Sequence, residues 1–213
     1  MIEWVSAEPA PPGYRFIAAR RIQAGWLVCH RLQPGDEPEL SEAVMVSLDH
    51  LRPWMPWARD YTPQVAAEFM ELHGGQADQT PVADALYVIR DRCGRLLGGC
   101  GLHARLGAHR LEIGYWVDVR HTRRGVATLA CAALTELALT IPELKVVEIH
   151  HDRANLASAA IPAKLGYTHV ATCRDTPHAP GEIGIEWQWR MSRAGWPNCP
   201  GAQLLAAARM TTP

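Results

Sequence analysis

The stretch LEIGYWVDVRHTRRGVA, Leu111 to Ala127, decides the fold because it joins a strand to a helix through a short basic loop. The residues up to Val117 have the composition of a strand, and an apolar run from Gly125 to Leu139 predicts a helix. The first amides of a helix have no partner inside it, and the helix dipole adds to their attraction for an anion. The junction therefore predicts an anion site made of main-chain groups. An ordinary strand-to-helix turn with solvated arginines has the same pattern.

Two common nucleotide-binding loops are absent from the sequence. It contains no G-x-x-x-x-G-K-[ST] motif and no G-x-G-x-x-G motif, which disfavours ATP and NAD. Gly125 leaves room for close approach of the backbone to a ligand. Arg120, Arg123 and Arg124 add positive charge beside it. The pattern thus indicates a phosphate-bearing ligand of another kind.

A second informative segment, RANLASAAIPAKLGYTHV, follows the apolar strand LKVVEIHHD. It reads as N-x-x-S at the start of a helix, with Asn155 and Ser158, and a closing L-G-Y at Leu165 to Tyr167. Asn is a favourable N-cap and Gly a favourable helix end, so an amphipathic helix with ordinary caps also explains this pattern.

The two segments, in this order, resemble the acyl-CoA-binding elements of the GNAT superfamily of N-acyltransferases. Gly125 and Ala127 fit the family motif [QR]-x-x-G-x-[GA], whereas Thr122 replaces the usual Gln or Arg and Arg123 stands where many relatives have a second glycine. The resemblance implies that acetyl-CoA is the co-substrate and that main-chain amides hold its diphosphate. It places the cofactor against Trp116, Val117, Arg123, Arg124, Gly125, Val126, Ala127, Thr128 and Asn155.

The N-terminal half is similar to the ribosomal-protein N-acetyltransferase branch, which is RimJ/RimL-like. The similarity rests on the run SLDHLRPWMPWA at Ser47 to Ala58, and the resemblance covers roughly residues 15–191. In that branch a tryptophan-bearing segment borders the acceptor site. We therefore expect Trp54 and Trp57 to contact the acceptor, or else to fill the core beside the first helices.

Acetyl transfer to an amine needs a base for the amine and a proton for the departing sulfur. The resemblance implies that Ser158 supplies that proton. Glu112 is the first candidate for the base, because alternation places it with Gly114 and Trp116 on one strand face, although a salt-bridged strand carboxylate would look the same. His103, His150 and His151 are alternative bases, and His103 and His150 are expected to face the substrate.

Composition limits the remaining possibilities. We expect one domain over residues 1–213, with a core at about 15–191 and a C-terminal extension at 192–213. The charged fraction of 20% and the net charge of -1 disfavour binding to nucleic acid or anionic membranes through overall charge. With no spanning run and no signal peptide pattern, the protein is expected to be cytoplasmic. Adjacent His150 and His151 diverge on a strand, so no metal site is expected.

The expected fold is α/β, with a GNAT-like mixed, partly antiparallel central sheet of about seven strands flanked by helices and split between the fourth and fifth strands. Cys93-Gly94 is expected to form a hairpin turn. The expected strands are residues 26–32, 85–90, 95–103, 110–117, 146–151, 167–174 and 185–191, and the expected helices are residues 37–49, 62–73, 125–139 and 155–165.

These expectations combine into an acyl-CoA-dependent N-acetyltransferase that acts by direct transfer in a ternary complex, because no cysteine lies in a nucleophile context. The acceptor is a protein or peptide N-terminus or a small amine, including an aminoacyl nucleotide or an aminoglycoside-like antibiotic. A non-catalytic acyl-CoA sensor is the alternative from a different class. The chain is either a monomer or a homodimer.

Overall fold

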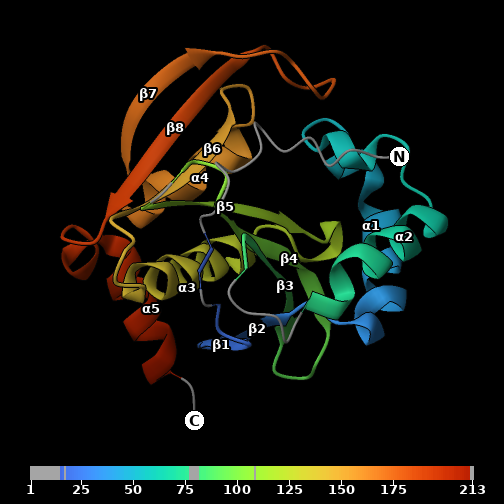
Figure 1. Ribbon diagram of the computed structural model, residues 1–213, viewed down its shortest axis with the longest axis horizontal. Coiled ribbons are helices and arrows are strands. Elements are labelled where there is room, and N and C mark those ends of the chain that lie inside the picture. Colours follow the sequence, from blue (N-terminus) through green and yellow to red (C-terminus); the bar gives the residue numbers. More distant parts are fainter. Residues whose placement is uncertain (1–14, 17, 77–81, 108, 212–213) are drawn as a thin grey trace.

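The fold is built around one eight-stranded sheet, seen in the computed structural model, which describes residues 15–16, 18–76, 82–107 and 109–211 (Figure 1). The strand order is β1-β2-β3-β4-β5-β6-β8-β7. The predicted mixed α/β class is confirmed, with one strand more than expected. The strands are β1 (Arg21–Ala24), β2 (Leu27–Arg31), β3 (Asp84–Asp91), β4 (Leu96–His103), β5 (Arg110–Val117), β6 (Val146–Asp152), β7 (Thr168–Arg174) and β8 (Ile185–Ser192).

The additional strand is β1, which pairs antiparallel with β2 and places Ala24 opposite Leu27. The turn between them uses Gly25 at φ +57°, a backbone conformation that glycine adopts without steric cost. A four-residue strand is too short to show a clear alternating pattern, which is why the sequence did not predict it.

The four predicted helices are confirmed to within two residues at each end, and a fifth lies in the C-terminal extension. They are α1 (Glu37–Leu51), α2 (Pro63–His73), α3 (Val126–Thr140), α4 (Leu156–Leu165) and α5 (Pro200–Met210). Helix α5 packs against α3 and β1, with Leu205 fully buried. The C-terminal apolar run therefore docks on its own chain.

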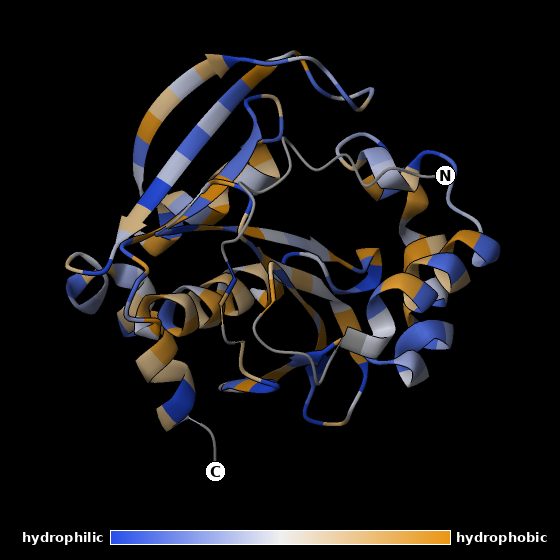
Figure 2. Cartoon of the chain, in the orientation of Figure 1, coloured by the Kyte–Doolittle hydropathy of each residue, from blue (hydrophilic) through white to orange (hydrophobic). Residues whose placement is uncertain are grey.

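The helices cover the two faces of the sheet separately. Helix α3 is buried along most of its length and forms, with α5, the main apolar cluster on one face (Figure 2). Helices α1 and α2 form smaller apolar clusters on the other face, where Trp116 of β5 packs against them. Among the described residues no helix is both long and apolar enough to cross a lipid bilayer.

The sheet splits between β5 and β6, its one parallel pair. Pairing extends only over Arg110–Glu112 with Val146–Glu148, and beyond Glu112 the two strands separate. Strand β5 continues to Val117, paired with β4 on its other edge. The predicted split between the fourth and fifth expected strands is confirmed. It leaves one edge of residues 113–117 without a strand partner among the residues that the structure describes.

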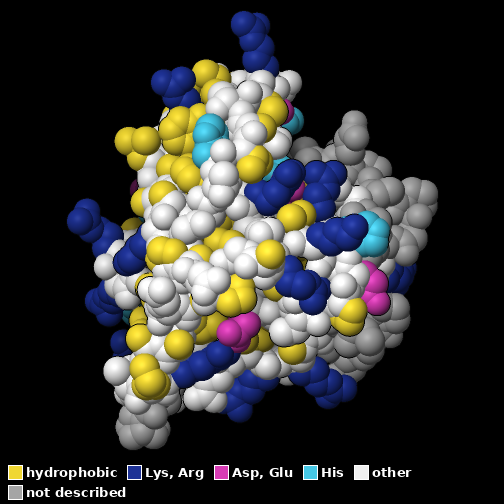
Figure 3. Space-filling model, turned by 90° about the vertical axis from the view of Figure 1, so that its left-hand side faces the viewer, with side chains coloured by type: hydrophobic (Ala, Val, Ile, Leu, Met, Phe, Trp, Pro, Cys, Tyr) yellow, Lys and Arg dark blue, Asp and Glu magenta, His cyan; other side chains and the backbone are white. Residues whose placement is uncertain are grey.

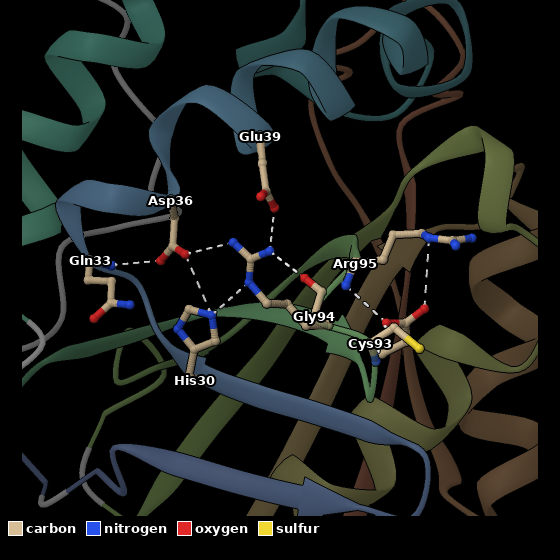
Figure 4. A network of polar contacts seen from close by, with 9 residues as sticks. His30, Gln33, Asp36, Glu39, Cys93, Gly94 and Arg95 are labelled. Atoms are coloured by element: carbon tan, nitrogen blue, oxygen red, sulfur yellow. Dashed lines mark hydrogen bonds and ion pairs between the residues drawn. The ribbon is translucent and has the colours of Figure 1, made fainter.

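The first helix is fixed to the sheet by a polar network around Arg90 (Figure 4). The Arg90 guanidinium donates to Asp36 Oδ1 at 3.0 Å, to His30 Nε2 at 3.0 Å and to the Gly94 carbonyl at 2.7 Å, and it also pairs with Glu39. Because Asp36 and Glu39 lie at the start of α1, this network joins the helix to β2 and to the β3–β4 turn. It positions α1 on the face of the sheet opposite α3.

Candidate active site

The junction between β5 and α3 forms a cradle of free main-chain donors. Arg123 and Gly125 adopt positive φ values of 60° and 81°, and Gly125 is the N-cap of α3. Within the described part of the chain, the amides of residues 123–128 donate no hydrogen bond. A Cβ on Gly125 would have no neighbour within 4 Å, so the cradle is open. Successive free amides around left-handed residues are a typical anion-binding arrangement.

Hydrogen bonds within residues 118–120 and to α1 stabilise the loop that carries the cradle. The Asp118 carboxylate is buried, and it accepts bonds from the Arg120 amide at 2.8 Å and from the Arg120 side chain. Arg120 also donates to Glu42 of α1 at 2.9 Å, and the Val119 amide donates to Ser47 Oγ at 2.9 Å. Arg120 is thus a structural cation.

Arg123 and Arg124 differ from Arg120 because both are exposed and neither makes an ion pair with another described residue. Arg123 occupies the position at which many GNAT relatives have a second glycine, and it keeps the glycine-like positive φ. The two guanidinium groups therefore stand free beside the amide cradle.

A hydroxyl pair lies where α4 begins. The Tyr115 and Ser158 hydroxyls are 2.8 Å apart, and Tyr115 Oη also lies 3.3 Å from the Ser158 carbonyl. Asn155 Oδ1 accepts from the Ser158 amide at 3.0 Å, which fixes the first turn of α4. Burial raises the pKa of Tyr115, so its phenol keeps its proton at neutral pH. This pair can donate a proton.

Tyr115 reaches α4 because β5 alternates as the sequence predicts. Leu111 and Ile113 belong to the apolar cluster around α3, and Tyr115 and Val117 pack against it. Trp116 packs on the opposite side, near α1 and α2.

A row of polar side chains crosses the face opposite α3 at the level of the split. Register pairs Asp84 with His103, His103 with Glu112, Glu112 with Glu148, and Glu148 with Arg190. Residues paired in this way project from the same face of a sheet. The row therefore brings together Glu112 and His103, two of the predicted site residues.

Glu112 is bound by Arg105 of the β4–β5 connection. Arg105 Nε donates to Glu112 Oε2 at 2.7 Å, and its Nη2 pairs with Oε1. Glu112 is only 5% exposed. Both carboxylate oxygens thus face a fixed cation in a bidentate pair.

His150 lies beside the row and is held by two carboxylates. Its Nε2 is 2.8 Å from Glu148 Oε2, and its Nδ1 is 3.5 Å from Glu186 Oε2. Burial acts to lower the pKa of His150, but the hydrogen bonds to Glu148 and Glu186 outweigh it and raise the pKa to about 9. His150 is therefore protonated at pH 7 and cannot take a proton there.

The β7–β8 connection contacts the segment between α1 and α2, and these contacts form a bridge between the two parts of the chain. The Gly181 amide, in the β7–β8 connection, donates to the Pro53 carbonyl at 2.9 Å, and Arg59 donates to the His178 carbonyl at 3.0 Å. A Cβ on Gly181 would lie 3.1 Å from the Trp54 ring. Trp54 therefore lies at this bridge.

Trp57 lies deeper than Trp54. Its ring packs edge-on against Trp116 at 6.2 Å and against Tyr61 at 6.1 Å between centroids. It joins the apolar cluster between α1 and α2. One tryptophan of this segment thus lies at the bridge, and the other packs against the apolar cluster.

The near-zero net charge is unevenly distributed. Figure 3 shows many Lys and Arg side chains and few acidic ones on the face that carries the ends of α3 and α5. The net charge of the whole chain therefore does not represent the charge of this face. Among the described residues, no group of three or more His, Cys, Asp or Glu side chains is placed to hold a metal ion.

Sequence reasoning missed several contributors. Tyr115 lies in the decisive strand, and its contact with α4 depends on tertiary packing. Asp152 accepts from the amides of Ala154, Ile183, Gly184 and Ile185, and so ties the start of α4 to the β7–β8 connection. Asp152 is the last residue of β6, and nothing in the neighbouring sequence indicates that it binds these four amides.

The chain is similar to known acetyltransferases. The sequence model of the acetyltransferase (GNAT) domain matches residues 27–168. YdaF of Bacillus subtilis strain 168, which is named a putative ribosomal N-acetyltransferase, is 26% identical over 155 residues, which cover 68% of this chain and 79% of that protein.

Solved structures share the fold. Mycobacterium smegmatis RimJ in complex with CoA-disulfide matches with a TM-score of 0.74 and 21% identity, covering 89% of this chain and 92% of that one. RimL, the ribosomal L7/L12 alpha-N-protein acetyltransferase in complex with coenzyme A, matches with a TM-score of 0.70 and 16% identity, covering 81% and 97%. The resemblance read from the sequence is confirmed, and the chain belongs to the acetyltransferase (GNAT) family.

Proposed function

We propose that this acetyltransferase moves an acetyl group from acetyl-CoA to a primary amine, the N-terminal amine of a protein or peptide, within a ternary complex. The observation that carries the proposal is the run of free amides at residues 123–128, placed beside the unpaired edge of β5. The names of YdaF and RimL support a ribosomal-protein N-terminus as the acceptor.

The residues present fit coenzyme A. The cradle amides, with Arg123 and Arg124, match a diphosphate in charge and in donor number. The open edge of β5 at Trp116 and Val117 offers main-chain groups to the amide-bearing arm of the molecule, and the Asn155 side-chain nitrogen makes no bond with another described residue. Acetyl-CoA supplies the activated acetyl group when bound.

The hydroxyl pair supplies the proton for the departing sulfur. Ser158 is the donor that we propose, and Tyr115 lies behind it at 2.8 Å and can replace the lost proton. The raised pKa of Tyr115 keeps that phenol protonated. Donation at this point prevents the build-up of a thiolate and contributes to transfer.

The acceptor approaches from the α1/α2 face. There the polar row and Trp54 border the gap, below the bridge between Gly181 and Pro53. A free peptide end is slender enough to pass beneath a bridge of this kind. Contacts of Trp54, Trp57, His103 and His150 with the acceptor are part of the proposal.

The test is a thiol-release assay with peptides and small amines, run on the wild type, Glu112→Gln and Ser158→Ala. We expect release with at least one peptide N-terminus, intersecting double-reciprocal lines, and a rate about 10- to 100-fold lower in Ser158→Ala. Release with small amines alone would replace the peptide acceptor by a detoxifying role. Binding of coenzyme A without release on any amine would support a sensor and contradict the proposal.

A further inference from the structure

We propose that His103, oriented by Asp84, is the base that takes the proton from the acceptor amine. The inference rests on the proposed function and names the proton acceptor that the function requires. His103 Nδ1 lies 2.7 Å from Asp84 Oδ1, its neighbour across the β3–β4 ladder. The two residues come from adjacent strands at the level where β5 and β6 separate.

The contact with Asp84 decides which ring nitrogen is free. Burial acts to raise the pKa of Asp84, but the hydrogen bond and the charge of His103 outweigh it and keep that pKa below its ordinary value. An ionised carboxylate only accepts hydrogen bonds, so Nδ1 carries the proton in the neutral ring. The lone pair is then on Nε2, which bonds to no other described residue.

Two glycines leave room for that nitrogen over β4 and β5. Gly101 and Gly114 are paired across β4 and β5. A Cβ on Gly101 would lie 2.9 Å from His103 Nε2, and one on Gly114 would lie 3.1 Å from the same atom. The imidazole thus lies over bare backbone, with Nε2 above Gly114, two residues past the last β5–β6 pair.

The neighbouring groups leave this role to His103. Both oxygens of Glu112 face Arg105, so its carboxylate is occupied, and His150 already carries a proton at neutral pH. The side chain of His103 is 20% exposed, so water can carry the proton away. The Glu112–Arg105 pair lies beside His103 and has a structural role in the site.

The step balances as follows. The amine nitrogen forms a bond to the acetyl carbon as the carbon–sulfur bond breaks, and the proton leaving the nitrogen goes to His103 Nε2. The sulfur takes a proton from the Ser158 hydroxyl, Ser158 regains one from Tyr115, and Tyr115 in turn regains one from solvent. The imidazolium then loses its proton to solvent, so that one acetylamine and one free thiol are formed.

Four charged or titratable groups face His103. These are Asp84 on β3, Glu112 on β5, Arg105 on the β4–β5 connection and His73 at the end of α2. Loss of the base should therefore change the pH profile of transfer. A structural role for the histidine would leave that profile unchanged.

The experiment measures kcat, KM for acetyl-CoA and the pH–rate profile for the wild type, His103→Ala, Asp84→Asn and Glu112→Gln. His169→Gln, which removes an exposed histidine on β7, is the matched control. For His103→Ala we expect a fall in kcat of about 100-fold at pH 7, an unchanged KM for acetyl-CoA and partial rescue by added imidazole. Asp84→Asn should lower kcat by about 10-fold, because the ring loses its orientation.

Gly114→Ala adds an independent arm, since its Cβ displaces Nε2 without removing the imidazole. It should lower kcat while the affinity for coenzyme A is kept. The proposal is overturned if His103→Ala stays within threefold of the wild type, or if Glu112→Gln rather than His103→Ala removes the acidic limb of the profile. A wild type that releases no thiol with any amine would overturn the proposed function itself.

Discussion

Removal of His150 should change the stability of the protein in a pH-dependent way. The side chain is 11% exposed and lies between Glu148 and Glu186. Its pKa rises from 6.5 to about 9 in the folded state. A group whose pKa is raised by folding contributes stability that is complete below the unfolded pKa and is lost as the pH rises through the folded pKa.

The magnitude follows from the two pKa values. At about 1.4 kcal/mol for each pH unit, the interval from 6.5 to about 9 corresponds to about 3 kcal/mol. The stability advantage of the wild type over His150→Gln should therefore be about 3 kcal/mol larger at pH 6 than at pH 10. At pH 7.5 about 2 kcal/mol of this pH-dependent part should be left.

Urea unfolding at pH 6, 7.5 and 10, followed by circular dichroism, measures the difference directly. Groups that His150 does not contact act equally in both proteins and cancel. Glu148 and Glu186, whose pKa values are lowered in part by His150, are already ionised in the wild type over this pH range. His169→Gln serves as the control, because this histidine is exposed and has no carboxylate partner among the described residues. A difference that stayed constant with pH, or grew as the pH rose, would refute the reasoning.

Three further predictions concern the site. Gly125→Ala should lower the stability by about 1 kcal/mol, because an L-residue is strained at φ +81°. It should also weaken coenzyme A binding measured by calorimetry. Gly35→Ala is the control, since Gly35 is equally open but has no positive φ, and it should change neither quantity. Tyr115→Phe should lower kcat about 10-fold with an unchanged KM for acetyl-CoA, and an unchanged kcat would argue against the hydroxyl relay. Asp152→Asn should lose about 3 kcal/mol in thermal or urea unfolding, since a charged acceptor of four amides is replaced, and a loss below 1 kcal/mol would speak against that clamp.

Much of the fold follows from local signals in the sequence. Thr62 before Pro63 predicts the start of α2, and the structure shows the Thr62 hydroxyl capping the Val65 amide. Caps also mark the two ends of α4. Asn155 is its N-cap, and Gly166, in the left-handed region, is its C-cap. Caps depend on neighbouring residues alone, and so they can be recognised without tertiary information.

The partners of the site residues could not be predicted in this way. Tyr115 and Ser158 are separated by 43 positions, and their contact requires α4 to lie against β5. The Asp84–His103 pair depends on the register of β3 and β4, which strand patterns do not specify. The capture of Glu112 by Arg105 depends on how the connection between two strands folds back. Alternation along a strand predicts on which face of the sheet a side chain lies, but tertiary packing determines which residues it contacts.

The measurement that tests the central claim most directly is an NMR titration of the labelled protein with coenzyme A, with pantetheine as the ligand that lacks the diphosphate. The free amides of residues 123–128 should show the largest chemical-shift changes with coenzyme A and only small ones with pantetheine. Shifts that are concentrated elsewhere, or that are equal for the two ligands at these amides, would contradict the account.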